Sequence, residues 1–520
     1  MRENPDLMHL PYAAIPAGAL PHAPILAPMP RSGPAVSPTY LRVVRRAGES
    51  AQDGAASVEL APTGPDIGWA RWRWDGRAVT VETCRYGLRP LYYHAAPDRF
   101  LIAPSIATLL ALGAPAELDA AAVAVYLRFE NFLGEDTPFR HIRALPPAAR
   151  LRWDGTLSVT GSLHRPTPQP MARAAAAEEY GRLFRAAIER AATTPVVVPL
   201  SGGCDSRHGA LELARVGRLH ACVSVRSMPP RSDDDVRIAV KVARALGASH
   251  TVLDHDDDRY AATVEATVET SFGGREHSWF RPLAAHFADP ALADAPVLDG
   301  LGGDVLSAGL FLEPVGLALF RRGRIAELAH HYMRGHDGPL PFLAEQALAP
   351  AAAARERLTA ELARHQDAAN PVGSFFFWNR TRRVVALSFF AMLGEHRLIT
   401  PYLDPAVFDF LAGLPAELFL DHQFHREAVH RAFPDLAGIG FARSGREDAD
   451  QGPVRAHFRR YGRAILRRLE AWPSRMIDQR YALRRIRYLA WWGSPDACWT
   501  ADACLYLNQL EHAAHEAPQL

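Results

Sequence analysis

The sequence predicts an α+β N-terminal domain of short antiparallel strands, followed by an α/β domain with a doubly wound parallel sheet and a helical extension. Two patterns carry this prediction. From Tyr40 to about residue 165, short segments of alternating polarity are separated by turn residues such as Trp74-Asp75-Gly76, which is typical of antiparallel strands. From about residue 174, helical patterns alternate with apolar strands, and this rhythm favours a parallel sheet.

The first part of the chain begins irregularly and then gives a series of strands. Residues 1–40 are rich in Pro and Ala and show little periodicity, so we expect irregular structure there. Helical patterns cover 104–113 and 119–130, and residues 164–173 have the composition of a linker. The expected strands are LRVVRR, GWARWRWDG, AVTVETCRYG, PLYYHA, FLIAPS, ARLRWDG and LSVTG.

The second part places a strand after each of its first helices. The expected pairs are helix 174–193 with strand 195–200, helix 206–216 with strand 219–226, and helix 233–247 with strand 250–253. From residue 320 onward the chain is mostly helical and rich in arginine. The patterns divide the sequence into an irregular segment, a first domain, a second domain and a helical extension, at 1–40, 41–165, 174–450 and 451–520.

Composition and charge exclude several classes of protein. The 520 residues are 48% hydrophobic and 22% charged, which suits ordinary globular cores, and the net charge of +1 argues against a broad nucleic-acid or membrane surface. No apolar run approaches the roughly 20 residues that span a bilayer, and the N-terminus lacks a signal-peptide pattern. The five cysteines are too widely spaced for a metal or disulfide framework, so we expect reduced thiols in a cytoplasmic protein.

The most informative motif is VVVPLSGGCDSR, from Val196 to Arg207. A buried strand, a glycine turn and a helix N-terminus follow one another, so backbone N–H groups and hydroxyls are presented to an anion. The glycines allow the backbone to approach a phosphate closely, and the turn lacks the Gly-Lys-Ser/Thr of a Walker A loop. We assign to the nucleotide Leu200, Ser201, Gly202, Gly203, Asp205 and Ser206, together with Ser224 in the strand 219–226.

A second glycine turn with an acid follows a strand in VLDGLGGDVLSAG, from Val297 to Gly309. We assign Asp205 and Asp304 as ligands of one Mg²⁺, because two carboxylates from separate loops can clamp a metal on a highly charged leaving group. Gly302 and Gly303 are assigned to the nucleotide. The alternative for this motif is a tight turn whose Asp caps the next helix.

Further polar clusters have two interpretations each. Ser232 and the acids Asp233–Asp235 precede a helix, where acids favour the helix dipole, or they border the adenine and ribose. Glu395 and Arg397 form a buried structural pair, or they orient a substrate amine. A surface position is the alternative for three residues that can line the same cleft, Glu269, Glu276 and His277.

Taken in order, the motifs resemble those of the asparagine synthetase superfamily over roughly 175–445. They are SGGCDSR, SDDDVRIAVKVARALGASH, DGLGGD, GEHRLITPYLD and the LP of Leu414-Pro415. The first of them looks like the pyrophosphate-binding loop of enzymes that split ATP into AMP and pyrophosphate. Upstream, CRYGLRPLYY, LIAPSIATLL and the LPP at 145–147 resemble the glutaminase-type half of the same proteins. The resemblance implies a degenerate Ntn-hydrolase-like sandwich followed by an adenine nucleotide α-hydrolase-like domain.

The chain departs from the glutamine-using members of this superfamily at its N-terminus. Those members carry a nucleophilic cysteine directly after the initiator methionine, whereas residue 2 here is Arg2 and the first cysteine is Cys84. We therefore expect the fold without the glutaminase chemistry, and an amine that arrives with the substrate itself. Members without this cysteine include β-lactam synthetases and lasso peptide cyclases, and both FENFLGEDTPFRHIRALPP, residues 129–147, and Arg207 look most like the cyclase group.

The second departure is a missing lysine. The family usually places a lysine after the LP segment, but FARSGRED, residues 441–448, offers only Arg443 and Arg446, and the only lysine of the chain is Lys241. Arginine binds phosphate bidentately but is not a proton donor near neutral pH. We expect Lys241 to lie on the surface. The resemblance assigns Glu395, Arg397, Arg443 and Arg446 to catalysis.

The resemblance implies an ATP- and Mg²⁺-dependent amide ligase that adenylates a carboxylate and closes it with an amine, most like a lasso peptide macrolactam synthetase. Its substrate would be a peptide or small-molecule carboxylate, and a leader-peptide-binding protein or peptidase would be its partner. The alternatives are an ammonia-dependent asparagine synthetase, a β-lactam synthetase-like cyclase and an inactive nucleotide-binding scaffold.

Overall fold

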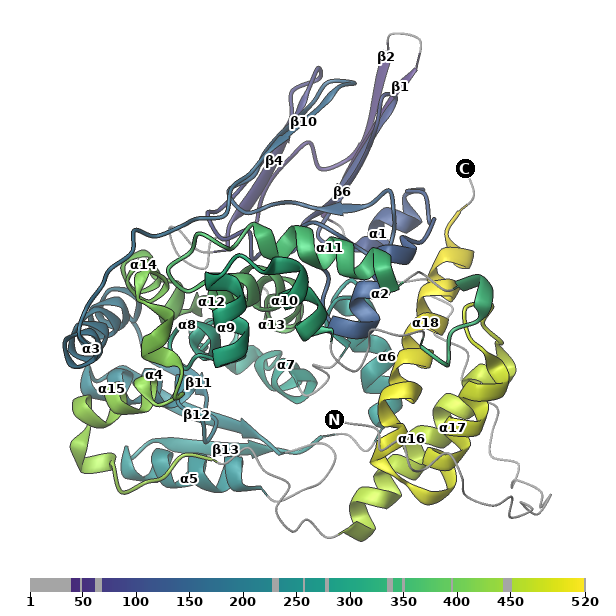
Figure 1. Ribbon diagram of the computed structural model, residues 1–520. Helices are drawn as coiled ribbons and strands as arrows, with labels where there is room; N and C mark the ends of the chain where they lie inside the picture. Colours follow the sequence, from purple (N-terminus) through teal and green to yellow (C-terminus); the bar gives the residue numbers. More distant parts are fainter. Residues whose placement is uncertain are drawn as a thin grey trace.

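A computed structural model shows an antiparallel sandwich standing on a larger α/β body, with a helical bundle on one side (Figure 1). The structure describes residues 39–46, 49–60, 68–226, 233–255, 258–275, 280–333, 340–347, 351–393, 396–442 and 451–518.

The N-terminal sandwich consists of two five-stranded antiparallel sheets, in the orders β2-β1-β7-β6-β8 and β10-β9-β5-β4-β3. In β4 the residues alternate between buried and exposed, as expected for a sheet with one face in a core. The buried rings of Trp72, Phe100 and Trp153 fill the space between the sheets. The strands are β1 (Leu41–Arg46), β2 (Glu49–Gly54), β3 (Ser57–Leu60), β4 (Ala70–Trp74), β5 (Val79–Thr83), β6 (Tyr92–Ala96), β7 (Arg99–Ala103), β8 (Arg143–Ala144), β9 (Arg150–Trp153) and β10 (Leu157–Thr160).

Two helices connect the sandwich to the rest of the molecule. Helix α1 (Ile106–Ala111) is capped by Ser105, and α2 (Ala120–Phe129) is capped by Asp119, whose carboxylate accepts a hydrogen bond from Ala122 N. Such N-caps satisfy amide groups that have no partner within the helix. Helix α2 ends at Glu130, which has a left-handed backbone with φ of 58°.

The second body is organised around a five-stranded sheet in which all pairings are parallel, in the order β13-β12-β11-β14-β15. In chain order, β12 and β13 lie on one side of β11, and β14 and β15 then lie on its other side. The order therefore reverses between β11 and β14, and ligands of such sheets bind at this switch point, beyond the carboxyl ends of the strands. The strands are β11 (Val196–Pro199), β12 (Leu219–Val225), β13 (Ser249–Leu253), β14 (Val297–Leu298) and β15 (Leu398–Ile399).

Helices surround this sheet, with α4 against β11 and α5 against β12 and β13. Helix α12 continues through a π-helix, η5 (Phe377–Val385), into α13. The α-helices are α3 (Arg173–Ala191), α4 (Asp205–Arg215), α5 (Asp234–Ala245), α6 (Arg259–Glu269), α7 (Arg281–Phe287), α8 (Gly303–Leu306), α9 (Pro314–Arg321), α10 (Ile325–Tyr332), α11 (Ala351–Ala363), α12 (Pro371–Phe376), α13 (Ala386–Leu393), α14 (Pro405–Gly413) and α15 (Phe424–Ala432). Short 3-10 turns are η3 (Pro290–Leu292), η4 (Glu345–Ala347), η6 (Pro401–Leu403), η7 (Ala416–Phe419), η8 (Pro434–Leu436) and η9 (Pro495–Ala497).

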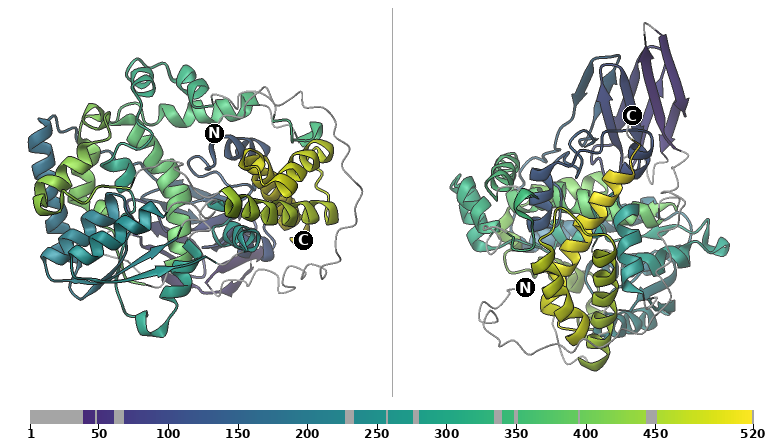
Figure 2. Two further views of the ribbon diagram at one scale, coloured as in Figure 1. Left: turned by 90° about the horizontal axis from the view of Figure 1, so that it is seen from below. Right: turned by 90° about the vertical axis from the view of Figure 1, so that its right-hand side faces the viewer.

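The C-terminal bundle comprises α16 (Gln451–Ala471), α17 (Gln479–Trp492) and α18 (Cys498–Glu516). It lies beside α6 and the helices of the N-terminal domain (Figure 2). The rings of Tyr126 on α2 and Tyr506 on α18 stack with centroids 4.4 Å apart, and Tyr506 donates a hydrogen bond to Phe272 O. One apolar core thus joins the first helices of the chain to its last, which ties the extension to the N-terminal domain.

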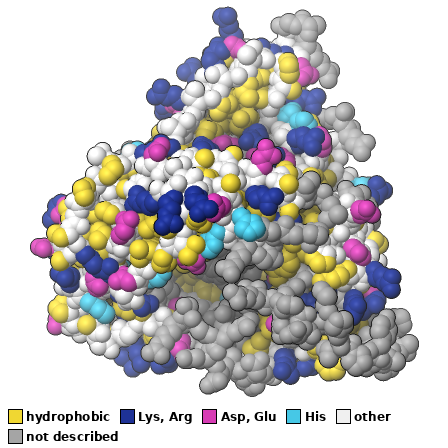
Figure 3. Space-filling view, viewed as in Figure 1, with side chains coloured by type: hydrophobic (Ala, Val, Ile, Leu, Met, Phe, Trp, Pro, Cys, Tyr) yellow, Lys and Arg dark blue, Asp and Glu magenta, His cyan; other side chains and the backbone are white. Residues whose placement is uncertain are grey.

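The antiparallel N-terminal sheets and the parallel sheet expected from the sequence are both present. All five cysteines are free thiols, and among the described residues no helix has the length and apolar character needed to cross a bilayer. Acidic and basic side chains are interspersed over the face shown in Figure 3, in keeping with the net charge of +1.

Candidate functional site

The two glycine turns singled out in the sequence meet at the switch point of the parallel sheet. The SGG loop, residues 200–204, follows β11 and leads directly into α4, while the second turn, residues 299–303, follows β14 and leads into α8. Because β11 and β14 are parallel neighbours, both turns leave the same edge of the sheet. The two acidic motifs are therefore side by side although about 100 residues separate them.

Hydrogen bonds among its own serines hold the SGG loop in a tight curve. Ser201 N donates to Ser206 Oγ over 2.9 Å, and Gly203 N donates to Ser201 Oγ over 3.2 Å. The two hydroxyl oxygens lie 3.0 Å apart. Amide and hydroxyl donors thus converge at the start of α4, which is the arrangement that binds phosphate in other strand–turn–helix units.

Neighbouring strands fix the beginning of this loop. Leu200 N donates to Val223 O over 2.7 Å, and Ser224 Oγ donates to Leu200 O over 2.5 Å. The same hydroxyl lies 2.8 Å from His250 Nε2, and burial lowers the pKa of His250. Ser224 therefore lies near the carboxyl end of β12, beside the loop, and its hydroxyl holds the loop backbone.

A backbone segment and an acid close on Gly202 from outside. Gly202 N donates to Asp235 Oδ1 over 2.9 Å, and Ala442 N donates to Gly202 O over 2.9 Å. A Cβ on Gly202 would lie 2.8 Å from the Ala442 Cβ and 2.9 Å from Asp235 O, so no larger residue fits without a shift. The Arg207 guanidinium donates to Ile439 O and Gly440 O, and these contacts bind the 439–442 segment to the loop.

Asp205, the first residue of α4, is in close contact with the second turn. A Cβ on Gly303 would lie 2.7 Å from Asp205 Oδ1, and a Cβ on Gly300 would lie 2.7 Å from the Asp205 Cβ. Glycine at both positions is what allows the carboxylate to approach this turn. Asp205 Oδ1 is buried and accepts no hydrogen bond from a described residue, although His425 Nδ1 lies 3.1 Å away. A buried carboxylate oxygen without a donor is suited to a cation.

Two more acids flank Asp205 and alter one another's protonation. Burial, reinforced by the charge of Asp205, raises the pKa of Asp304 to about 6. Burial also raises the pKa of Asp299 to about 7, with Asp205 and Asp304 adding to the effect. Arg380 faces this group, since its Nη1 on η5 lies 3.4 Å from Asp304 Oδ2. Carboxylates that raise one another's pKa in this way are typical of a site that receives further positive charge.

The donor set fits Mg²⁺ bound jointly by protein and phosphate. Mg²⁺ prefers oxygen ligands and is commonly held by one or two carboxylates together with substrate phosphates. Asp205 and Asp304 would be those carboxylates. The described residues contain no group of three or more His, Cys, Asp or Glu side chains that could hold a metal by themselves. A shared site of this kind therefore depends on the nucleotide.

A buried polar network supports Asp205 from beneath. Tyr402 OH donates to the Asp205 carbonyl oxygen over 3.3 Å and lies 3.3 Å from His425 Nε2. Tyr180 OH lies 3.2 Å from both His208 Nδ1 and His425 Nε2. Burial and the proximity of His425 lower the pKa of His208 far below its usual range. These buried hydrogen bonds hold the N-terminus of α4 in place.

The structure does not bring every residue singled out in the sequence to this edge. Arg397 precedes β15 and thus lies at the amino end of the sheet, where its guanidinium donates to Ala191 O and Thr193 Oγ1. It is not near Asp205. Glu269 pairs with Arg281 on the surface, and Lys241 is exposed on α5. Outside the described residues lie Ser232, Glu276, His277, Glu395, Arg443 and Arg446.

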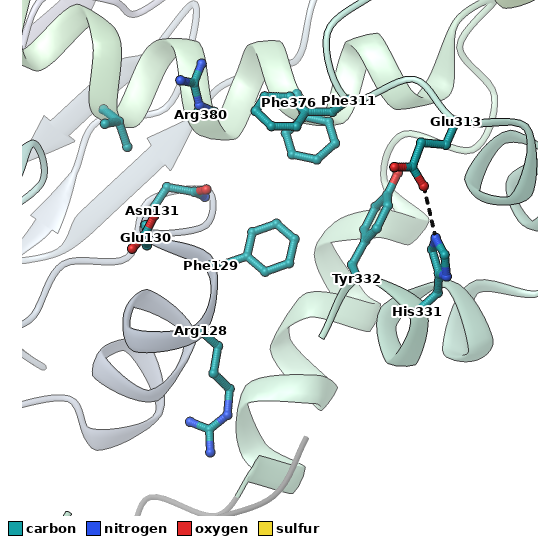
Figure 4. Close-up of a pocket in the computed structure, with 11 residues that line it drawn as sticks. Arg128, Phe129, Glu130, Asn131, Phe311, Glu313, His331, Tyr332, Phe376 and Arg380 are labelled. Carbon is teal, nitrogen blue, oxygen red and sulfur yellow. Dashed lines mark ion pairs between the residues drawn. The ribbon is translucent and has the colours of Figure 1, made fainter. Parts of the chain in front are cut away.

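Beside Asp304, an open cavity of about 590 Å³ is lined mainly by aromatic rings and charged side chains. Figure 4 shows side chains from α2, from the turn before α9, from α10 and from the helix that carries Phe376 and Arg380 around one space. Arg380 also pairs with Asp304 and so connects this cavity to the acidic turns. The lining residues are Arg128, Phe129, Glu130, Asn131, Phe311, Glu313, His331, Tyr332, Phe376, Arg380 and Val384.

Sequence reasoning missed several residues of the site. Asp299 stands inside the DGLGGD motif, where the sequence pattern points only to Asp304 as a metal ligand. Asp235 belongs to an acidic run with a plain helix-dipole explanation. Arg380 and His425 carry no local signal, because only the fold brings their helices to the two turns. The stretch 371–393 contains three arginines among mainly apolar residues, and this contrast is a weak signal in the sequence.

Comparison with known protein families agrees with this geometry. Residues 179–469, just over half of the chain, match the family described as asparagine synthase, and residues 69–160 match the glutamine amidotransferase domain. A search of curated protein sequences found no match. The family match implies an ATP-dependent carbon–nitrogen ligase. With both acidic turns at the switch point of its parallel sheet, the chain belongs to the asparagine synthase family.

Proposed function

We propose that this protein adenylates a substrate carboxylate with ATP and then closes it with an amine of the same molecule, forming a macrolactam as in lasso peptide biosynthesis. The observation that carries the adenylation step is the contact between the two acidic turns, where Gly300 and Gly303 allow Asp205 to lie against the turn that holds Asp304. AMP is one product of the proposed reaction. We also propose a degenerate Ntn-hydrolase-like fold for the N-terminal domain and an adenine nucleotide α-hydrolase-like fold for the second domain.

The proposed reaction has two steps. A carboxylate oxygen of the substrate bonds to the α-phosphorus of ATP as the bond to the bridging oxygen breaks, and pyrophosphate leaves. The amine nitrogen then bonds to the acyl carbon, AMP leaves, and the amine proton passes to solvent. Magnesium held by Asp205 and Asp304 would offset the charge of the departing pyrophosphate. The SGG loop would bind phosphate oxygens through its amides and serine hydroxyls.

The first thiol of the sequence, that of Cys84, is not placed to attack glutamine, because this residue is 1% exposed within the apolar core. An amine within the substrate is therefore the simplest nitrogen source, and holding both reacting groups in one cleft removes the entropic cost of a second encounter. A leader-peptide-binding protein or peptidase would deliver such a substrate.

Pyrophosphate exchange tests this proposal. The purified full chain is incubated with MgATP and labelled pyrophosphate, in parallel with peptides that carry an Asp or Glu side chain and with aspartate plus ammonia. We expect exchange with a peptide, and loss of at least a hundredfold in the Asp205→Asn variant. Asp367→Asn is the matched control, because the Asp367 side chain is 82% exposed.

Each outcome has a distinct meaning. Exchange that persists in Asp205→Asn refutes the metal assignment. Exchange driven by aspartate, with asparagine as product, identifies an ammonia-dependent asparagine synthetase instead. ATP binding without exchange for any acid indicates a nucleotide-binding scaffold, and a four-membered lactam product indicates a β-lactam synthetase-like cyclase.

A further inference from the structure

The open cavity beside Asp304 has a wall of stacked rings, which we name the aromatic wall and define as Phe129, Phe311, Tyr332 and Phe376 (Figure 4). Phe311 and Phe376 stack with centroids 4.3 Å apart and planes 23° apart. Phe129 lies nearly parallel to Phe376, at 6.4 Å and 12°, and Tyr332 meets Phe376 at 5.7 Å and 60°. The rings form one continuous apolar surface along the cavity.

Phe311 is held in an unfavourable backbone conformation to join this wall. Its φ is 66°, a left-handed value that is strained and rare for a bulky residue. Its ring is nevertheless 37% exposed, so core packing does not account for the strain. On its other side the Arg380 guanidinium lies 5.1 Å from the ring centroid. Strain of this kind clusters at ligand-binding positions.

A second residue with a left-handed backbone, Glu130, lies on the part of the cavity that α2 lines. Glu130, at the end of α2, has φ of 58°, and the buried guanidinium of Arg275 donates to its Oε1 over 2.9 Å. Glu130 follows Phe129 in sequence, so this ion pair positions the backbone that carries the ring. On the far wall Glu313 pairs with His331 at 3.6 Å. Each acid of the cavity thus has a basic side chain beside it.

Arg380 connects the aromatic wall to the acidic turns. One face of its guanidinium lies over Phe311, and Nη1 lies 3.4 Å from Asp304 Oδ2. Phe376, Arg380 and Val384 recur every four residues along α12 and the π-helix η5, and π-helices are frequent at functional sites. An anionic group resting on Arg380 would lie next to the Asp205 and Asp304 site, with its apolar neighbour against the rings.

We propose that this cavity binds the acyl substrate, and that the substrate is a peptide or acyl-amino acid with an aromatic or large apolar side chain next to its reacting carboxylate. The inference rests on the proposed function. Free aspartate has no apolar surface to place against the rings. The cavity volume of about 590 Å³ falls in the range of about 300–1,000 Å³ that pockets for larger ligands occupy. Arg380 pairs with the carboxylate, and the aromatic wall selects its neighbour.

Two blocked dipeptides test the selection, N-acetyl-Phe-Asp-amide and N-acetyl-Gly-Asp-amide, each with a single carboxylate. Their binding to the full chain is measured by calorimetry without nucleotide. We expect the aromatic peptide to bind at least tenfold more tightly. Phe311→Gly is the decisive variant, because glycine adopts a left-handed φ without strain. It should keep the circular dichroism spectrum of the wild type at the temperature of the titration and reduce the preference to less than twofold.

Two further variants complete the design. Val315→Ala, at a residue that is 55% exposed on α9 and outside the cavity, should keep the preference. Arg380→Gln should weaken both peptides, because both carry the carboxylate. Equal binding of the two peptides, no binding of either at millimolar concentration, or a preference that survives Phe311→Gly would overturn the inference. A preference that is lost in Phe311→Gly, with no pyrophosphate exchange by any acid, would instead overturn the proposed function and leave the cavity assignment standing.

Discussion

Acidification should weaken MgATP binding through Asp304, and the structure sets the size of the effect. Burial and the neighbouring Asp205 charge raise the pKa of Asp304 to about 6, and a carboxylate must lose its proton to bind a metal. With that pKa the ionised fraction falls from about 0.9 at pH 7 to about 0.1 at pH 5, so we expect the affinity to fall roughly tenfold.

The assay is calorimetric titration of the full chain with MgATP at several pH values between 5 and 7.5. ATP itself takes up protons in this range, so the Asp304→Asn variant is titrated under the same conditions as the reference. Asparagine keeps the size of the side chain and an oxygen ligand but has no proton to exchange. The difference between the two proteins isolates Asp304. Identical pH profiles for the wild type and Asp304→Asn would refute the reasoning.

Stability without metal should change with pH in the opposite direction. An acid whose pKa is higher in the folded state binds more protons there than in the unfolded chain, so the free energy of unfolding falls as pH rises through that interval. For Asp304 and Asp299 the interval runs from their usual 3.8 to about 6 and about 7. The melting temperature attributable to these acids therefore decreases toward pH 7, and Mg²⁺ with ATP should restore it.

Three other changes probe different parts of the site. Gly303→Ala should weaken MgATP binding at least tenfold, because its Cβ would lie 2.7 Å from Asp205 Oδ1; unchanged calorimetric affinity would contradict the close-approach argument. Arg397→Ala should leave this affinity within twofold and lower stability in urea by about 1 kcal/mol, the typical worth of a hydrogen bond, and a large loss of binding would place Arg397 in the site after all. Iodoacetamide should modify Cys204 slowly at pH 8, since burial raises the pKa of its thiol to about 12, and rapid labelling followed by mass spectrometry would disprove this.

Local patterns predict many of the strands: β11 is an apolar run whose first three residues are buried, and other strands alternate between buried and exposed residues. β4 is an example, with buried Trp72 and Trp74 between exposed arginines. Alternating polarity does not predict β2, because every residue of ESAQDG is exposed and the strand lies at the edge of its sheet. Such a strand is held by backbone pairing to β1, which leaves no mark in hydrophobic periodicity.

Some residues of the candidate site can be predicted from the sequence and others cannot. The two glycine turns can be recognised in the sequence because the residues of each turn lie within one continuous strand–turn–helix unit. Arg397 shows the limit: it lies five residues before Tyr402, which contacts Asp205, but the two-residue strand β15 begins directly after it, so it falls at the opposite edge of the sheet. Residues that are close in sequence can thus lie at opposite ends of a strand. Arg380 shows the converse, since only tertiary packing brings it to Asp304.

The helix that carries Arg380 also connects the N-terminal domain to the candidate site. Asn379, the preceding residue, accepts a hydrogen bond from Gly134 N, and the buried guanidinium of Arg382 donates to Gly134 O and Leu145 O. The π-helix therefore forms hydrogen bonds with the N-terminal domain, while its Arg380 pairs with Asp304 and lines the cavity. Since α2 of the same domain supplies Phe129 to the cavity wall, removing the domain would remove both a support and a wall of the proposed acyl site.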